Sequence, residues 1–97
     1  MQRLFAVTRS RGAGWDASRP MEGQKGWRQH ADFMNALHEG RFVLLGGPLE
    51  GTPDVLLIVK ANDPDEIWRR LSDDPWSGDL LSVAQIIPWI LRLGSLE

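Results

Sequence analysis

The segment RFVLLGGPLEGTPDVLLIVK, residues 41–60, decides the fold because it holds two apolar runs joined by a short link of turn residues. The first run, residues 41–45, predicts a strand, and the Gly-Gly-Pro run at 46–48 predicts a tight bend after it. Residues 55–60 are almost continuously apolar, which is typical of a central strand covered on both faces. The short link between the two runs favours a β-hairpin.

A strand and a helix precede this hairpin, and a helix and a strand follow it. Apolar residues at spacings of three and four mark the first helix, and Gly40 is predicted as its C′ glycine. The order β-α-β-β-α-β predicts an α+β domain of the ferredoxin-like type with an antiparallel sheet. The segments predicted outside the hairpin are a strand at 2–8, a helix at 24–39, a helix from Pro64 capped by Asn62 or Asp63, and a strand within 80–93.

The first strand is apolar on both faces, since Leu4 and Ala6 alternate with Phe5 and Val7. In a ferredoxin-like fold both helices lie on one face of the sheet, so the other face needs a different cover. In one short chain only a second subunit provides that cover. We therefore expect a homodimer or higher homo-oligomer in which two sheets face each other as a dimeric α+β barrel.

The composition limits the classes of function. The 97 residues form one predicted domain, 1–97, with a net charge of −2 and no basic run, which argues against nucleic-acid binding. The chain has no cysteine, and its apolar runs are too short for a membrane span. We expect a cytoplasmic protein because no signal peptide is visible. The last two residues, Leu96-Glu97, resemble a vector remnant, and no prediction depends on them.

His30 is the first candidate for chemistry. It lies on the predicted first helix, one turn after Trp27 and one turn before Phe33 and Met34. A neutral imidazole on such an aromatic-rich face can act as a general base. The alternative is a core or interface histidine that only satisfies a hydrogen bond.

The second candidate is the turn Asp73-Asp74-Pro75-Trp76. One carboxylate can stay solvated while the other points inward, accepts from a histidine ring nitrogen and fixes its tautomer. The alternative is an ordinary turn, in which aspartate is common.

Arg9 and Arg11 follow the predicted first strand, in a long loop that also holds Trp15. They are candidates to bind an anionic group of a ligand, and solvated loop charges are the alternative. His38, in the last helical turn, suits a capping role. Two histidines without cysteine or a HExxH spacing predict no metal site, and no motif indicates a cofactor.

Several short motifs, taken together and in order, resemble those of the YCII-related (YciI-like) family. The resemblance runs from the first strand to Trp89 and so covers nearly the whole chain. The residues that carry it are His30-Ala31-Asp32-Phe33-Met34, Leu37, Gly40, Leu45-Gly46-Gly47-Pro48-Leu49, residues 55–59, Asp74-Pro75-Trp76 and Pro88-Trp89.

The resemblance implies a dimeric α+β barrel similar to muconolactone isomerase, with a His–Asp pair in a pocket. Carried over by motif, the pair is His30 and Asp74. One class of family members removes chloride from a chlorinated hydroxyhydroquinone, and most members have no assigned reaction. The resemblance therefore implies a site more firmly than an activity.

The resulting hypothesis is a small-molecule enzyme that uses His30 and Asp74 for acid–base chemistry without a cofactor. Isomerase, lyase and dehydrochlorinase reactions stay equally open. An aromatic or lactone-like substrate would be bound by residues proposed from the sequence: Arg9, Arg11, Trp15, Trp27 and Trp76. The alternative is a non-catalytic module that binds a small ligand or serves as a structural dimer.

Overall fold

The computed structural model describes residues 1–96, and Glu97 lies outside them. The described residues form a four-stranded antiparallel sheet with strand order β2-β3-β1-β4 and two α-helices. This confirms the predicted α+β class and is consistent with a ferredoxin-like fold. The elements are β1 (Arg3–Arg11), a 3₁₀ turn η1 (Met21–Gly23), α1 (Trp27–Glu39), β2 (Val43–Pro48), β3 (Asp54–Ala61), α2 (Pro64–Leu71) and β4 (Leu81–Pro88).

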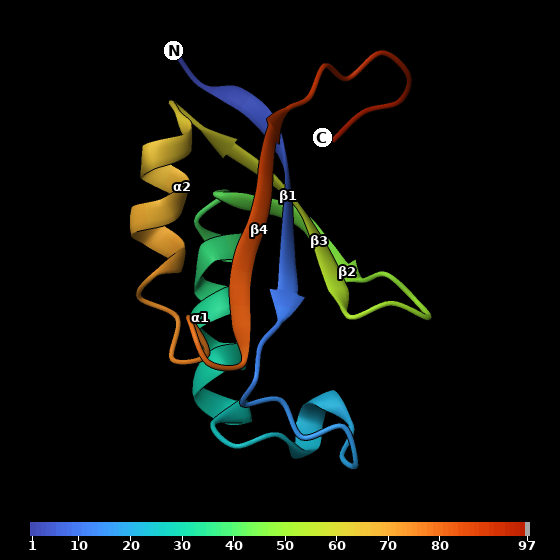
Figure 1. Ribbon diagram of the computed structural model, residues 1–97. Helices are drawn as coiled ribbons and strands as arrows, with labels where there is room; N and C mark the ends of the chain where they lie inside the picture. The colour runs from blue at the N-terminus through green and yellow to red at the C-terminus, as the bar shows by residue number, and fades with distance from the viewer. Residues whose placement is uncertain (97) are drawn as a thin grey trace.

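Figure 1 shows both helices on the same side of the sheet, with α2 near the start of β1 and α1 nearer its end. The chain begins and ends at one end of the sheet, where the segment after β4 turns away from the strands. Neither helix within residues 1–96 combines the length and the apolar character that crossing a membrane requires.

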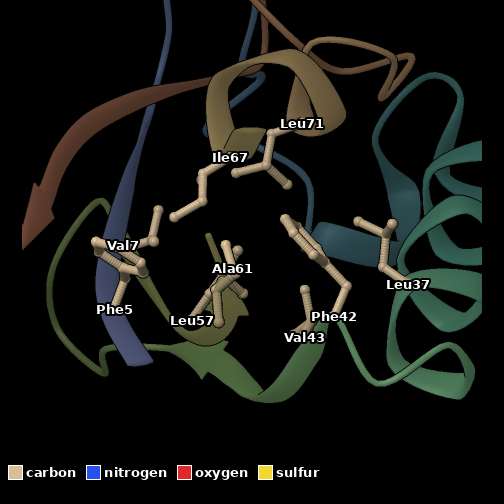
Figure 2. Close-up of a cluster of buried hydrophobic side chains, with 10 residues drawn as sticks. Phe5, Val7, Leu37, Phe42, Val43, Leu57, Ala61, Ile67 and Leu71 are labelled. Atoms are coloured by element: carbon tan, nitrogen blue, oxygen red, sulfur yellow. The ribbon is translucent and has the colours of Figure 1, made fainter. Parts of the chain in front are cut away.

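The main core lies between the sheet and the helices. Phe5 and Val7 of β1 point toward this side, as do Leu57 and Val59 of β3, and all four are almost fully buried. Ile67 of α2 closes the layer and has no exposed surface. Figure 2 shows the side chains of this cluster, which come from both helices, from β1, β2 and β3, and from Phe42 just before β2. The period-2 pattern of the strands thus supplies one continuous apolar layer.

The opposite face of the sheet carries apolar side chains as well, as predicted, together with polar ones such as Thr8, Lys60 and Gln85. A cross-strand row runs over all four strands, because Leu45 pairs with Ile58, Ile58 with Ala6, and Ala6 with Ile87. The ends of this row are open to solvent: Leu45 is 54% exposed and Ile87 is 46% exposed. Apolar side chains at this level of exposure on a sheet face are typical of an interaction surface.

Two strand boundaries differ from the prediction. Strand β1 continues past the predicted end at residue 8, so Arg9 and Arg11 lie in the strand and not in a loop. Strand β2 includes the Gly-Gly-Pro run at 46–48, which was wrongly predicted as a bend. Proline is tolerated there because β2 is an edge strand, and an edge residue can face away from the ladder without donating a hydrogen bond.

The ends of helix α1 also differ from the prediction. The helix begins at Trp27, three residues later than predicted, after Gly26 at a left-handed φ of 77°. At its other end Gly40 has a φ of −79°, and Arg41 takes the left-handed position with a φ of 66°. The prediction of Gly40 as the left-handed C′ glycine was therefore wrong by one residue.

Candidate functional site

The structure brings His30 and Asp74 into direct contact although 44 residues separate them in the sequence. Nδ1 of His30 lies 2.9 Å from Oδ1 and 2.8 Å from Oδ2 of Asp74. His30 is in the first turn of α1, and Asp74 is in the turn between α2 and β4. Both residues are buried. Asp73 is exposed, so Asp74 is the inward carboxylate of the pair.

Two further donors hold the Asp74 carboxylate. The backbone N–H of Trp76 donates to Oδ1 at 3.0 Å, and Nη1 of Arg9 donates to Oδ2 at 2.8 Å. The Arg9 and Asp74 side chains are 1% and 0% exposed. A buried carboxylate is stable only when charge and hydrogen bonds compensate its lost hydration. Asp74 meets this condition through partners from three separate segments of the chain.

These contacts determine the charge state of Asp74. Burial alone would raise the pKa of its carboxyl group, but hydrogen bonds from His30, the Trp76 N–H and Arg9 outweigh burial and leave the pKa below its usual value. Asp74 is therefore ionised at neutral pH and can only accept hydrogen bonds. Nδ1 of His30 must carry the proton, which leaves Nε2 of a neutral ring as the proton acceptor.

Aromatic side chains fix the plane of the His30 ring. Trp76 stacks on it with ring centroids 3.9 Å apart and planes 6° apart, and Trp76 is itself 1% exposed. The indole N–H of Trp76 donates to the backbone oxygen of Lys25 at 2.7 Å. Trp27 and Trp15 pack on Trp76 with centroids 5.9 Å and 5.6 Å away. The imidazole is thus held between its carboxylate partner and a packed indole.

A cavity of about 590 Å³ lies beside the pair, between α1 and the sheet. His30, Trp27 and Met34 of α1 form part of its wall, and Arg9 and Leu81 line it from the strands. This volume falls within the usual range for small-molecule sites, about 300–1,000 Å³. The His–Asp pair therefore adjoins a space large enough for a small organic ligand.

The proposed site residues separate into two groups. His30, Asp74, Trp76 and Arg9 are joined by direct contacts, and Trp27 packs against the two aromatic rings. Of the proposed residues, His30, Arg9 and Trp27 line the cavity, whereas Asp74, Trp76, Trp15 and Arg11 are not among the residues that line it. Trp15 contacts Trp76, and Arg11 is exposed with its guanidinium 4.4 Å from the Trp15 ring centroid.

Sequence reasoning missed two features of the site. It did not predict the buried pairing of Arg9 with Asp74, although Arg9 continues the alternation of Phe5 and Val7 toward the helices. It also assigned His38 only to the helix end. His38 lines the cavity, and its Nδ1 lies 3.0 Å from the Val43 carbonyl, which can only accept. The spacing of eight residues between His30 and His38 was the available signal, since it places both near one helix face.

Within residues 1–96 no group of three or more histidine, aspartate or glutamate side chains is arranged to hold a metal ion. The fold and the site define an α+β domain with a buried His–Asp pair that adjoins a cavity. Comparison of the chain with protein-family models and with curated proteins found no match.

Proposed function

We propose that the protein is a small-molecule enzyme that performs acid–base chemistry with His30 and Asp74 and needs no cofactor. The observation that carries this proposal is the contact of 2.8 Å between His30 Nδ1 and the Asp74 carboxylate, beside a cavity that His30 lines. The resemblance of its motifs to the YCII-related family supports the same pair.

In this proposal Nε2 of His30 accepts a proton from a C–H or O–H group of the bound substrate. Asp74 orients the ring and stabilises the imidazolium that forms, while Arg9 keeps the carboxylate ionised. Return of the proton to a different atom gives an isomerase, and loss of a leaving group such as chloride gives a lyase or dehydrochlorinase. A positioned acid–base group of this kind contributes about 10²–10⁴-fold to a rate.

The character of the cavity supports an aromatic or lactone-like substrate. Trp27 and Met34 present apolar surface on the helix side, and Val55 and Leu81 do so on the sheet side. Flat apolar walls with a few polar groups are typical of sites for small cyclic molecules.

The reaction can be sought without knowing the natural substrate. Enolisable lactones and chlorinated hydroxyhydroquinones are incubated with the protein in D₂O, and ¹H NMR follows loss of C–H signals and formation of products. For any compound that reacts, His30→Asn and Asp74→Asn should lower the rate about 10²–10⁴-fold. Asp73→Asn is the matched control because Asp73 is exposed, and its rate should stay at the wild-type value. A His30→Asn protein as fast as wild type contradicts the proposal.

A non-catalytic ligand-binding module is the second candidate, and the buried Arg9–Asp74 ion pair favours it. A carboxylate satisfied from three sides is also what a purely structural ion pair requires. Ligand binding that leaves every C–H signal and every compound of the panel unchanged would support this candidate over the enzyme.

We also propose that two copies pack their open sheet faces together as a dimeric α+β barrel. The row formed by Leu45, Ile58, Ala6 and Ile87 supports this, because it is apolar and its ends are exposed. Light scattering after size-exclusion chromatography should give twice the mass of one chain, or a higher multiple.

The variant Leu45→Asp tests which face is used, since it places a charge in the apolar row of the proposed interface and should yield monomers. Trp68→Asp is the control, because Trp68 is 53% exposed on α2, on the helix-covered side. A Leu45→Asp protein with unchanged mass contradicts the proposed interface.

A further inference from the structure

The guanidinium of Arg9 is buried but only partly used by the protein. Arg9 is 1% exposed, and its Nη1 donates to Oδ2 of Asp74 at 2.8 Å. Its Nε is buried and has no hydrogen-bond partner among residues 1–96. A buried donor without an acceptor costs free energy, so such groups are rare in native proteins and commonly serve a function. Arg9 also lines the cavity beside His30. The residue that carries the unpaired donor therefore belongs to the wall of a ligand-sized space.

The charges around this cavity favour an anion over a neutral acceptor. The described residues that line it include Arg9 and Arg28 but no aspartate or glutamate; Arg9 is the buried cation, whereas Arg28 is largely exposed and its Nη1 lies 3.5 Å from Oδ1 of Asp32. Asp74 is excluded from the lining because its carboxylate is enclosed by His30, Arg9 and the Trp76 N–H. The rest of the wall is largely apolar. Positive charge in a low-dielectric wall attracts a small anion with an apolar body.

We infer that the cavity binds small carboxylates with a flat apolar body, and that the carboxylate occupies the Nε–Nη2 edge of Arg9. In any guanidinium the Nε–H and one Nη2–H point the same way and form a fork that fits a carboxylate. Asp74 uses Nη1, so this fork is not taken by Asp74. Such carboxylates would be the substrate class of the proposed enzyme. The binding itself does not depend on that function, and only its consequence for the reaction rests on it.

That consequence follows from the common partner of the two side chains. Nη1 of Arg9 and Nδ1 of His30 both lie 2.8 Å from Oδ2 of Asp74, so guanidinium and imidazole are neighbours. A carboxylate on Arg9 would hold the carbon next to it close to His30. Arg9 then acts twice, since it positions Asp74 and binds the substrate.

Benzoate is a suitable probe because it joins a planar carboxylate to a flat apolar ring, and benzamide is its uncharged counterpart. The full chain is titrated with each compound while ¹H–¹⁵N spectra follow the arginine Nε–Hε signals. The Arg9 signal is identified by its absence in Arg9→Lys. We expect this signal to shift in a saturable way with benzoate, and benzamide to bind at least about tenfold more weakly.

Variants locate the binding group. Arg9→Lys keeps a cation able to pair with Asp74 but lacks the fork, and should weaken benzoate about tenfold or more. Arg3→Lys is the matched control on the same strand and the same face, outside the cavity, and should bind benzoate like wild type. Thermal unfolding of each variant identifies any protein that has failed to fold.

Two results would overturn the inference: an Arg9 Nε–Hε signal in the wild-type protein that benzoate does not move, or an Arg9→Lys protein that folds and binds benzoate equally well. The outcome is separable from the fate of the proposed enzyme. His30→Gln should still bind benzoate at Arg9, whereas its turnover should be about 10²–10⁴-fold slower. If benzoate binds but no compound is turned over, the proposed enzymatic function alone is refuted. If only uncharged compounds are turned over and benzoate does not bind, the proposed carboxylate site alone is refuted.

Discussion

Replacing Asp74 by asparagine should destabilise the protein strongly at neutral pH and hardly at all in acid. The change removes a fully buried negative charge that accepts from His30, from Arg9 and from the backbone of Trp76. Arg9 would remain buried without a counter-charge. Breaking a buried ion pair by removing one partner typically costs about 3–5 kcal/mol. We expect a loss of about 3 kcal/mol in the free energy of unfolding at pH 7, whereas Asp73→Asn should change it by less than about 0.5 kcal/mol.

The pH dependence follows from the lowered pKa of Asp74. A carboxyl group with a lower pKa in the folded state binds fewer protons there than in the unfolded chain, so its stabilising contribution is complete above the unfolded value of about 3.9. The contribution is lost as the pH falls through the folded pKa. The difference between wild type and Asp74→Asn should therefore shrink as the pH falls below about 4.

Urea unfolding monitored by tryptophan fluorescence, at one fixed protein concentration and at several pH values, measures this difference. A loss below about 1 kcal/mol at pH 7 would mean that the ion pair contributes little. A difference that stays the same down to pH 2.5 would refute the link between stability and ionisation of Asp74.

Two further substitutions test the packing around the site. Trp76→Phe removes the donor to the Lys25 carbonyl at 2.7 Å and leaves that oxygen unpaired, so unfolding should require about 1–3 kcal/mol less free energy, measured in urea. Gly46→Ala would place its Cβ 2.7 Å from the Leu57 side chain, which the core leaves little room to move, and should cost about 1–3 kcal/mol by thermal unfolding. Gly47→Ala has nothing within 4 Å of its new Cβ and should change stability by less than about 0.5 kcal/mol, so an equal loss in both glycine variants would contradict the packing argument.

The charged side chain of Arg9 occupies the helix-covered side of β1 because it pairs with Asp74. The strand alternation carries it to the same side as Phe5 and Val7, where an isolated cation would be unstable. Its pairing with Asp74 removes that cost only in part, because Nε stays unpaired.

Local chemistry was sufficient to predict the secondary elements whose signals lie within a few residues. The start of α2 is an example: Asp63 accepts from the Glu66 N–H at 2.9 Å, and Pro64 occupies the first turn. Such features depend on neighbours in the chain, so their order and type were accessible from the residues alone. The apolar alternation of β1 and β3 likewise indicated a sheet with two apolar faces.

The prediction of His30 and Asp74 had a different basis. Periodicity and turn chemistry made each residue a candidate, and only the resemblance to known motifs joined them as a pair. Contact between side chains 44 residues apart depends on how the helix and the turn pack on the sheet. Nothing in the local sequence encodes that distance.

The burial of Arg9 is a feature that the sequence alone could not predict. Short-range sterics and periodic burial determine the order of the elements, the helix caps and the faces of the strands. These features could therefore be predicted from the sequence. Whether a cation next to the end of a strand is solvated or buried depends on what the rest of the chain places opposite it. For Arg9 that partner is Asp74, 65 residues away, and only the folded chain brings its carboxylate within 2.8 Å. The burial of charge, the proton on Nδ1 of His30 and the cavity beside it were all decided at that tertiary level, because each depends on groups that are distant along the chain.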